Sequence, residues 1–239
     1  QEPLPVALVE STVGIEDFDM ISEYISLLFP IGSDQKLRVM HKSVVDWLKK
    51  VDKDSAYTIT VEQIQQAHAQ LGAECLNENA IENSAIQLYA LKHTVTHVCL
   101  GKEEEQLHSV RNNLLLQFSW LLKKVSDVGP FEAMVDCRTY LKIRTNDRPV
   151  KLIQHALQLS LPALYKDPRE LASQLVGGRL SMRYDKKMLP EILQVVKQAE
   201  KYRPDDGDGN GKKNPMWMPT TRLLTPAGHP LLAVMEGHT

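Results

Sequence analysis

A histidine at the expected start of a helix, His41, is the residue of this sequence best placed to do chemistry. It follows an alternating run at 36–40, which predicts a short strand, and it precedes Ser43 and an apolar pattern that predicts a helix. A neutral imidazole can donate an N–H to an anion near pH 7, so His41 could bind a phosphate oxygen. It could equally be structural, with its ring bonded to a backbone carbonyl. The local sequence leaves both interpretations open.

Two further histidines, His93 and His97, lie four residues apart in a predicted helix, with Cys99 close by. Two imidazoles on one helical face could begin a zinc site. However, no glutamate follows His93 as it does in helical metalloprotease motifs, and no fourth ligand stands out. Packed or surface histidines are the favoured interpretation, and we predict no metal-binding residue.

Two other stretches contain residue types that could bind a metal or act in catalysis. The run DGDGNG at 206–211 matches the first half of a calcium loop, but Trp217 stands where a bidentate glutamate is needed, so a flexible linker is favoured. Cys137 beside Asp136 has no evident histidine partner, which a catalytic thiol would need. The sequence has neither Gly-x-Ser-x-Gly nor a phosphate-binding Gly-x-x-x-x-Gly-Lys-Ser/Thr loop. We predict no catalytic residue and no enzyme.

The elements that must position His41 lie in residues 1–60. We predict helices at 3–13, at 16–29 and from Ser43, and strands at 36–40 and 56–60. In the second helix the apolar face is Phe18, Ile21, Ile25 and Leu28, at spacings of three and four residues. The order of helices and strands is typical of a winged helix without its first helix, so a partial winged-helix domain is expected.

Residues 61–203 are predicted to form an α-helical domain, repeat-like and arranged as a superhelix or a bundle. The helices are expected at 61–78, 84–100, 105–128 (one broken helix or two), 131–144, 149–165, 167–178 and 188–203. The first of them should bury Ile64, Ala67, Leu71 and Cys75 on one face. Residues 204–239 are expected to begin as a flexible linker, rich in Gly, Pro and Asn up to 215, and to continue as an extended segment. The predicted fold class is therefore mainly α.

Composition argues against several classes of protein. The 28 Lys and Arg against 30 Asp and Glu give a net charge of −2, so no basic field favours nucleic acid. Residues 16–29 contain acids and no Lys or Arg, which argues against DNA binding by a winged helix. No apolar run approaches the roughly 20 residues that span a bilayer. Three scattered cysteines and the lack of an Asn-x-Ser/Thr sequon favour the cytoplasm. Since Gln1 is not a natural start, we expect a piece of a longer protein.

Several stretches resemble one family of signalling proteins. The run VMHKSVVDWL (39–48) is similar to the Met-His-Asp region of the winged helix in STAND ATPases, which include the NACHT and NB-ARC switches, and Lys42-Ser43 resembles the animal NACHT proteins that carry WD-repeat propellers. AHAQLGAECL (67–76) resembles the start of their helical region. LYKDPRELASQLVGGRL (164–180) is similar to a segment before the propeller, and LTPAGHPLLAVMEGHT (224–239) to the lead-in of a first blade.

This resemblance implies a role for the chain. An upstream nucleotide-binding domain would bind ADP or ATP, and by position His41 would contact the β-phosphate of ADP in the resting state. The chain would couple a downstream WD-repeat propeller of the same protein to that switch, through autoinhibition and homo-oligomerisation on activation. Lys42 stands where the Met-His-Asp version has an acid, so no role of that acid transfers. The segment alone is expected to hold no cofactor and to hydrolyse nothing.

The residues also fit a plainer alternative. A helical-repeat protein–protein interaction module, with no nucleotide role, would bind a partner peptide in a groove. It predicts an exposed apolar groove and leaves His41 without a function. Neither interpretation involves nucleic acid or a membrane.

Overall fold

The computed structural model describes residues 3–13, 15–49, 59–77, 84–180 and 189–202, together with Leu224 and Ala227. Within these residues the protein is mainly α-helical, as predicted, and the only strands are two short ones. The chain divides into two compact units, Gln1–Val110 (unit 1) and Arg111–Thr239 (unit 2), and each is described here by itself. No helix among the described residues is long and apolar enough to cross a membrane.

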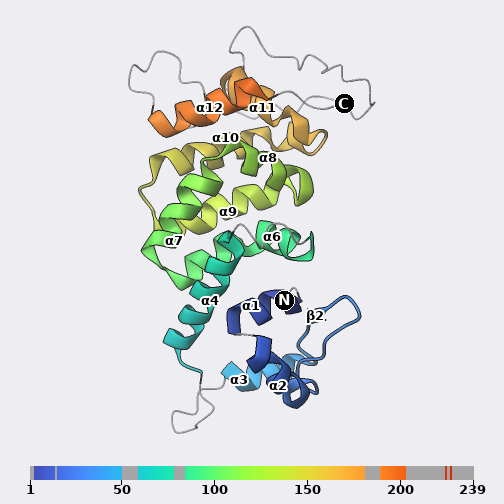
Figure 1. Cartoon of the computed structure of the whole chain (residues 1–239). Coiled ribbons are helices and arrows are strands. Elements are labelled where there is room, and N and C mark those ends of the chain that lie inside the picture. The colour runs from blue at the N-terminus through green and yellow to red at the C-terminus, as the bar shows by residue number, and fades with distance from the viewer. Residues whose placement is uncertain are drawn as a thin grey trace. The chain divides into compact units, whose positions relative to one another are not determined.

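Unit 1 begins with a small antiparallel pair that brings the N-terminal segment beside the residues preceding His41. Leu4 pairs with Leu37 and Pro5 with Lys36. The elements run β1 (Leu4–Pro5), α1 (Val6–Val13), α2 (Ile15–Ile25), β2 (Lys36–Leu37) and α3 (Lys42–Lys49), followed by α4 (Val61–Leu76), α6 (Ser84–Gly101) and α7 (Glu104–Ser109) (Figure 1). The predicted helix at 3–13 thus starts three residues later than expected, after a strand.

The α4–α6 pair forms the centre of unit 1, and small residues let the two helices approach closely. A Cβ built on Gly101 would lie 2.7 Å from the backbone N and Cα of Ala69, and one on Gly72 would lie 2.9 Å from Cγ2 of Val98. Helix α4 starts with a capping box, in which Thr60 and Gln63 each accept a hydrogen bond from the other's backbone N–H. The predicted strand at 56–60 is therefore not formed at Ile59 and Thr60, and its first three residues lie outside the described residues.

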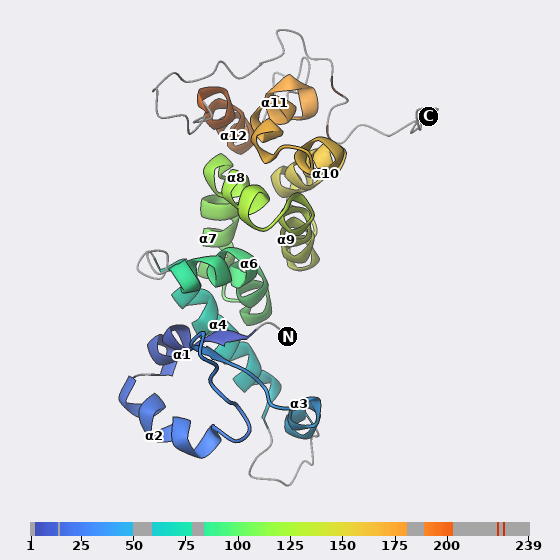
Figure 2. The same ribbon diagram turned by 90° about the vertical axis from the view of Figure 1, so that its right-hand side faces the viewer.

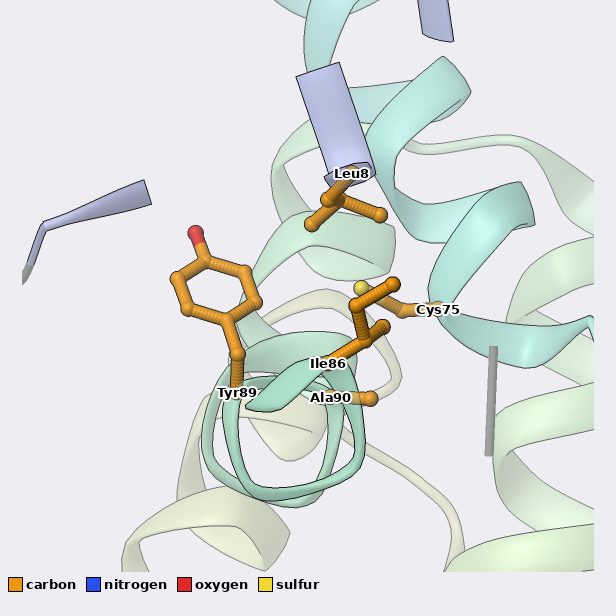
Figure 3. Close-up of a cluster of buried hydrophobic side chains, with 5 residues drawn as sticks. All are labelled: Leu8, Cys75, Ile86, Tyr89 and Ala90. Atoms are coloured by element: carbon orange, nitrogen blue, oxygen red, sulfur yellow. The ribbon is translucent and has the colours of Figure 1, made fainter. Parts of the chain in front are cut away.

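Helix α1 packs onto this pair through a small apolar core. Leu8 of α1, Cys75 of α4 and Ile86, Tyr89 and Ala90 of α6 are buried together (Figure 3). The face predicted for α4 is only partly right, because Ile64 and Ala67 are exposed while Ala69, Gly72 and Cys75 are buried. The helix turns a stripe of small residues, and not its largest apolar ones, toward α6.

The face predicted for α2 is also only partly right. Phe18 is buried, but Ile21 and Leu28 are exposed. The other large apolar side chains of this region, Met20, Tyr24 and Leu27, are exposed as well. Helix α2 packs against α1 (Figure 2), and these apolar side chains of its other face remain exposed.

Unit 2 is a series of helices with short connections. Its elements are a π-helical turn (Val110–Leu115, which begins at the unit boundary), α8 (Phe118–Asp127), α9 (Pro130–Ile143), α10 (Arg148–Leu164), a 3₁₀ turn (Pro168–Glu170), α11 (Leu171–Gln174), a π-helical turn (Leu175–Arg179) and α12 (Pro190–Lys201) (Figure 1). Most boundaries agree closely with those predicted, and the segment 105–128 is indeed broken, at 116–117. The helix predicted at 167–178 is instead a 3₁₀ turn, the four-residue α11 and a π-helical turn. The starts of these elements have local causes: Gly129 at φ +129° precedes Pro130, and the side chains of Asp147 and Asp167 cap the next two elements.

Side-chain hydrogen bonds join helices of unit 2 that are far apart in sequence. Arg111 binds Asp147 (Nε to Oδ2, 2.6 Å) and Glu191 (Nη2 to Oε1, 3.0 Å). The backbone N–H of Phe118, the first residue of α8, donates to Oε1 of Gln198 on α12 at 2.8 Å. These bonds fix α12 against α8 and the start of α10.

Two residues after the last described helix bond to the π-helical turn Leu175–Arg179. Leu224 N–H donates to the carbonyl of Gly177, and Ala227 N–H donates to that of Arg179. Gly178 has φ +136°, and a Cβ there would lie 2.8 Å from the carbonyl oxygen of Leu224. Apart from Leu224 and Ala227, the predicted linker and propeller lead-in at 204–239 lie outside the described residues. The predicted boundaries at 60/61 and 203/204 stay predictions, while compactness divides the chain at 110/111.

Candidate functional site

His41 lies directly before α3, in the short connection that follows β2, and its side chain is exposed. Its carbonyl accepts a hydrogen bond from the N–H of Val44 at 3.0 Å, which closes the first turn of the helix. The sequence therefore placed His41 correctly at the start of a helix, but the strand predicted at 36–40 covers only Lys36–Leu37. The helix begins at Lys42, and the positive end of its backbone dipole lies beside the imidazole.

The ring of His41 is held by the first turn of α3. The backbone N–H of Ser43 donates to Nδ1 at 3.1 Å, and the Ser43 hydroxyl lies 2.8 Å from the same nitrogen. Because a backbone N–H can only donate, Nδ1 is the acceptor, and the N–H of the neutral ring is on Nε2. The structural partner is thus a backbone N–H and not the carbonyl that the sequence suggested.

The arrangement leaves one defined polar group to act outward. The Nε2–H of His41 can donate to an anion while Nδ1 continues to cap the helix, so the structural and binding roles are compatible. Lys42, the next residue, is also exposed and adds a positive charge. Such a pairing of an oriented N–H with a helix N-terminus favours phosphate or carboxylate oxygens.

A second polar cluster joins α4 to α6. Nδ1 of His68 lies 2.9 Å from Nδ1 of His97, and Nε2 of His97 lies 2.9 Å from the hydroxyl of Tyr89. His93 packs its ring against Tyr89, with centroids 4.6 Å apart. In the contact between the two Nδ1 atoms, one nitrogen must carry the hydrogen and the other the lone pair. The two rings therefore cannot both be in the cationic form, in which both ring nitrogens are protonated.

Burial keeps His97 neutral. Loss of water around the ring, and then the neighbouring His68 and His93, lower the pKa of His97 from 6.5 to about 4. Burial also lowers the pKa of His68. At neutral pH His97 is therefore uncharged, and the hydrogen-bonded chain His68–His97–Tyr89 links the two helices.

The zinc site that was weighed at His93, His97 and Cys99 is not assembled. His97 is bonded to Tyr89 and His68, and Cys99 is buried. Among the described residues no group of three or more His, Cys, Asp or Glu side chains is placed to hold a metal ion. His68 was not predicted as part of this cluster, because it lies 29 residues before His97. The one signal in the sequence was its position next to Ala69, in the stripe of small residues of α4 that faces α6.

A cleft of about 980 Å³ opens in unit 1 between α3, β2 and the α4–α6 pair. Tyr89, His93 and His97 line one side, and Lys42 and Asp46 of α3 line the other. His41 is not among the residues that line it. The described lining contains no serine or cysteine.

Cys137 and Asp136 lie in α9 of unit 2, where Asp136 meets a buried lysine. Nζ of Lys124 lies 2.7 Å from Oδ2 of Asp136, and both side chains are almost fully buried. Burial raises the pKa of Asp136 to about 6, which still leaves it ionised at pH 7. Burial also raises the pKa of Cys137 well above its ordinary value. The Cys137 thiol is therefore protonated and inaccessible, and the Asp136 carboxylate forms an ion pair with Lys124.

Comparison of the chain with protein-family models, with curated proteins and with solved structures returned no match.

Proposed function

We propose that this chain is a regulatory and scaffold segment of a NACHT-type signal-transduction ATPase. In this proposal residues 1–60 act as a partial winged-helix domain that presents His41 to nucleotide held by an upstream domain. The helical segment that follows couples it to a downstream WD-repeat propeller. The protein works in the cytoplasm and assembles into homo-oligomers on activation.

The observation that supports this proposal is the fixed tautomer of His41. The Ser43 N–H occupies Nδ1, so the ring offers its Nε2–H to solvent beside the first turn of α3. A nucleotide phosphate is the ligand that such a donor suits, and a bond of this kind to a charged group contributes roughly 1.5–3 kcal/mol. It would bias a two-state switch about ten- to hundredfold toward the state in which the bond is made.

Such a bond cannot hold a switch alone, so the remaining bias must come from packing. Unit 2 suits that task because charged and amide side chains tie its helices together, as Arg111 does with Asp147 and Glu191. A rigid helical segment transmits a displacement that a flexible one would absorb. This part of the proposal rests on the resemblance and on rigidity, and not on any bound partner.

The nucleotide content of the purified protein, extended upstream to include the nucleotide-binding domain, tests the proposal. We expect wild type to retain ADP and His41→Ala to lose most of it, about ten- to hundredfold in affinity. His41→Asn separates capping from binding, because its carbonyl oxygen can still accept from the first turn while the Nε2–H is gone. It should lose ADP as His41→Ala does but keep the stability of wild type.

His108→Ala, at an exposed histidine of α7, is the matched control and should retain ADP. Equal ADP in wild type and His41→Asn would make His41 a structural cap only. The absence of nucleotide from every sample would favour the alternative, a helical protein–protein interaction module. The exposed apolar face of α2 is the feature that favours this second candidate.

A further inference from the structure

Helix α2 and the turn after it expose an unusual number of large apolar side chains. Tyr24 is 85% exposed, Leu27 77%, and Met20 66%, and Ile21 and Leu28 are also exposed. Scattered single apolar residues are common on protein surfaces, but a contiguous set marks an interaction site. Tyrosine, methionine and leucine side chains of this size are also expensive to leave in water.

These side chains share one face because of helical geometry. Met20, Tyr24 and Leu27 follow each other at spacings of four and three residues, and the backbone of Leu28 and Phe29 continues the helix with bonds to Ile25 O. Phe18 points into the protein, where it is buried. We call Met20, Ile21, Tyr24, Leu27 and Leu28 the α2 apolar face.

The sequence of α2 and of the turn after it is acidic. Residues 15–35 contain Glu16, Asp17, Asp19, Glu23 and Asp34 and no Lys or Arg. Glu23 is exposed next to Tyr24. The first basic residues that follow are Lys36 and Arg38, and Arg38 is neutralised by Asp34 through two bonds of 2.6 and 2.7 Å. A partner that covers this face must therefore approach an acidic surface.

From this combination we infer that the α2 apolar face binds an amphipathic protein helix whose apolar stripe is bordered by Lys or Arg. A second copy of this chain would place the two acidic segments against each other, and an anionic membrane surface would be repelled in the same way. A basic amphipathic helix satisfies both the exposed apolar area and the charge. The inference concerns a different surface from His41 and does not depend on the nucleotide role.

A pair of synthetic peptides tests this inference on the full chain. One is an 18-residue helix of leucines at i, i+3, i+4 and i+7 bordered by lysines, and the other has glutamates in place of those lysines. Titration calorimetry should show the lysine peptide binding at least about tenfold more tightly than the glutamate peptide, with an affinity that falls as salt rises. Tyr24→Ser combined with Leu27→Ser should weaken binding of the lysine peptide at least about tenfold.

Two further variants make the result decisive. Glu23→Lys should reduce the preference for the lysine peptide without loss of fold, since the residue is exposed. Tyr165→Ser, at another exposed tyrosine, in unit 2, should bind as wild type does. Circular dichroism of each variant verifies that it is folded.

Three results would overturn the inference. The first is equal affinity for the two peptides, or an affinity unchanged in the Tyr24/Leu27 double variant. The second is a concentration-dependent dimer in sedimentation that this double variant abolishes, which would assign the face to a second copy. The third is binding to phosphatidylserine vesicles that is lost in the same variant, which would assign it to a membrane.

Discussion

The histidines of this chain show how the same side chain takes different roles in different surroundings. His41 is exposed, and its tautomer is set by a backbone donor. His97 is buried, and its two nitrogens bind Tyr89 and His68 across two helices. The first is available for binding, while the second contributes to the contact between α4 and α6.

The lowered pKa of His97 predicts acid sensitivity. Its pKa is about 4 in the folded protein and 6.5 in the unfolded chain, so below pH 6.5 protons bind preferentially to the unfolded state. The free energy of unfolding should therefore fall as pH decreases from 6.5 toward 4, by about 2 kcal/mol between pH 7 and pH 5 from this residue. Urea denaturation of wild type at the two pH values measures the change.

His97→Asn is the comparison that isolates this contribution. The amide can still form hydrogen bonds with Tyr89 or His68, but it does not titrate. We expect the variant to lose about 2 kcal/mol less than wild type between pH 7 and pH 5. An identical pH dependence in the two proteins would show that the pKa of His97 is the same in the folded protein as in the unfolded chain.

Elements, rather than single residues, were the part of the structure that the sequence predicted best. Apolar periodicity and stop signals placed the helices from Val61 to Lys201 within a few residues of their observed ends. The faces were predicted less well, because close approach at Gly72 and Gly101 buries small residues of α4, and because α2 exposes its apolar side chains. Periodicity reports that a helix has an apolar face, but not whether a partner covers it.

Contacts between elements could not be predicted, since they join residues far apart in sequence or of unexpected type. His41 was placed correctly because its signal is local. His68 was missed, and so was the pair of Lys124 on α8 and Asp136 on α9. Lysine is almost never fully buried unless it is paired, so a lysine in a sequence is expected to be exposed. Nothing in the sequence around Lys124 indicates that it is an exception.

The Lys124–Asp136 pair should be important for the packing of α8 on α9. Lys124→Ala leaves the Asp136 carboxylate buried without its ion-pair partner, and we expect a loss of about 3–5 kcal/mol in the free energy of unfolding. Lys123→Ala, at the preceding exposed residue, should cost less than about 1 kcal/mol, because its contact with Asp127 is 3.7 Å long and lies in solvent. Chemical denaturation of both variants gives the comparison. Similar losses in the two would mean that the buried pair contributes no more than a surface pair.

At the scale of the whole molecule, the division at Val110–Arg111 predicts two regions that open separately. Gly101→Ala places a Cβ against the backbone of Ala69, so we expect it to destabilise the α4–α6 pair by about 1–3 kcal/mol. Hydrogen exchange should become faster in α4 and α6 and stay unchanged in α9 and α10.

Ala67→Leu is the control for this experiment, because that position of α4 is exposed and can accept a larger side chain. Its exchange should match that of wild type in both units. Faster exchange throughout unit 2 in Gly101→Ala would instead indicate one cooperative unit that includes the whole chain.

The approach of Leu224 to Gly178 also has an evolutionary consequence. Any side chain at position 178 would have to adopt a φ of +136° and would meet the Leu224 carbonyl oxygen at 2.8 Å. A lineage that replaces this glycine must therefore also reroute the backbone that bonds to Gly177 and Arg179. Among related sequences, we expect the glycine and the spacing between it and the segment around 224–227 to be inherited or lost together.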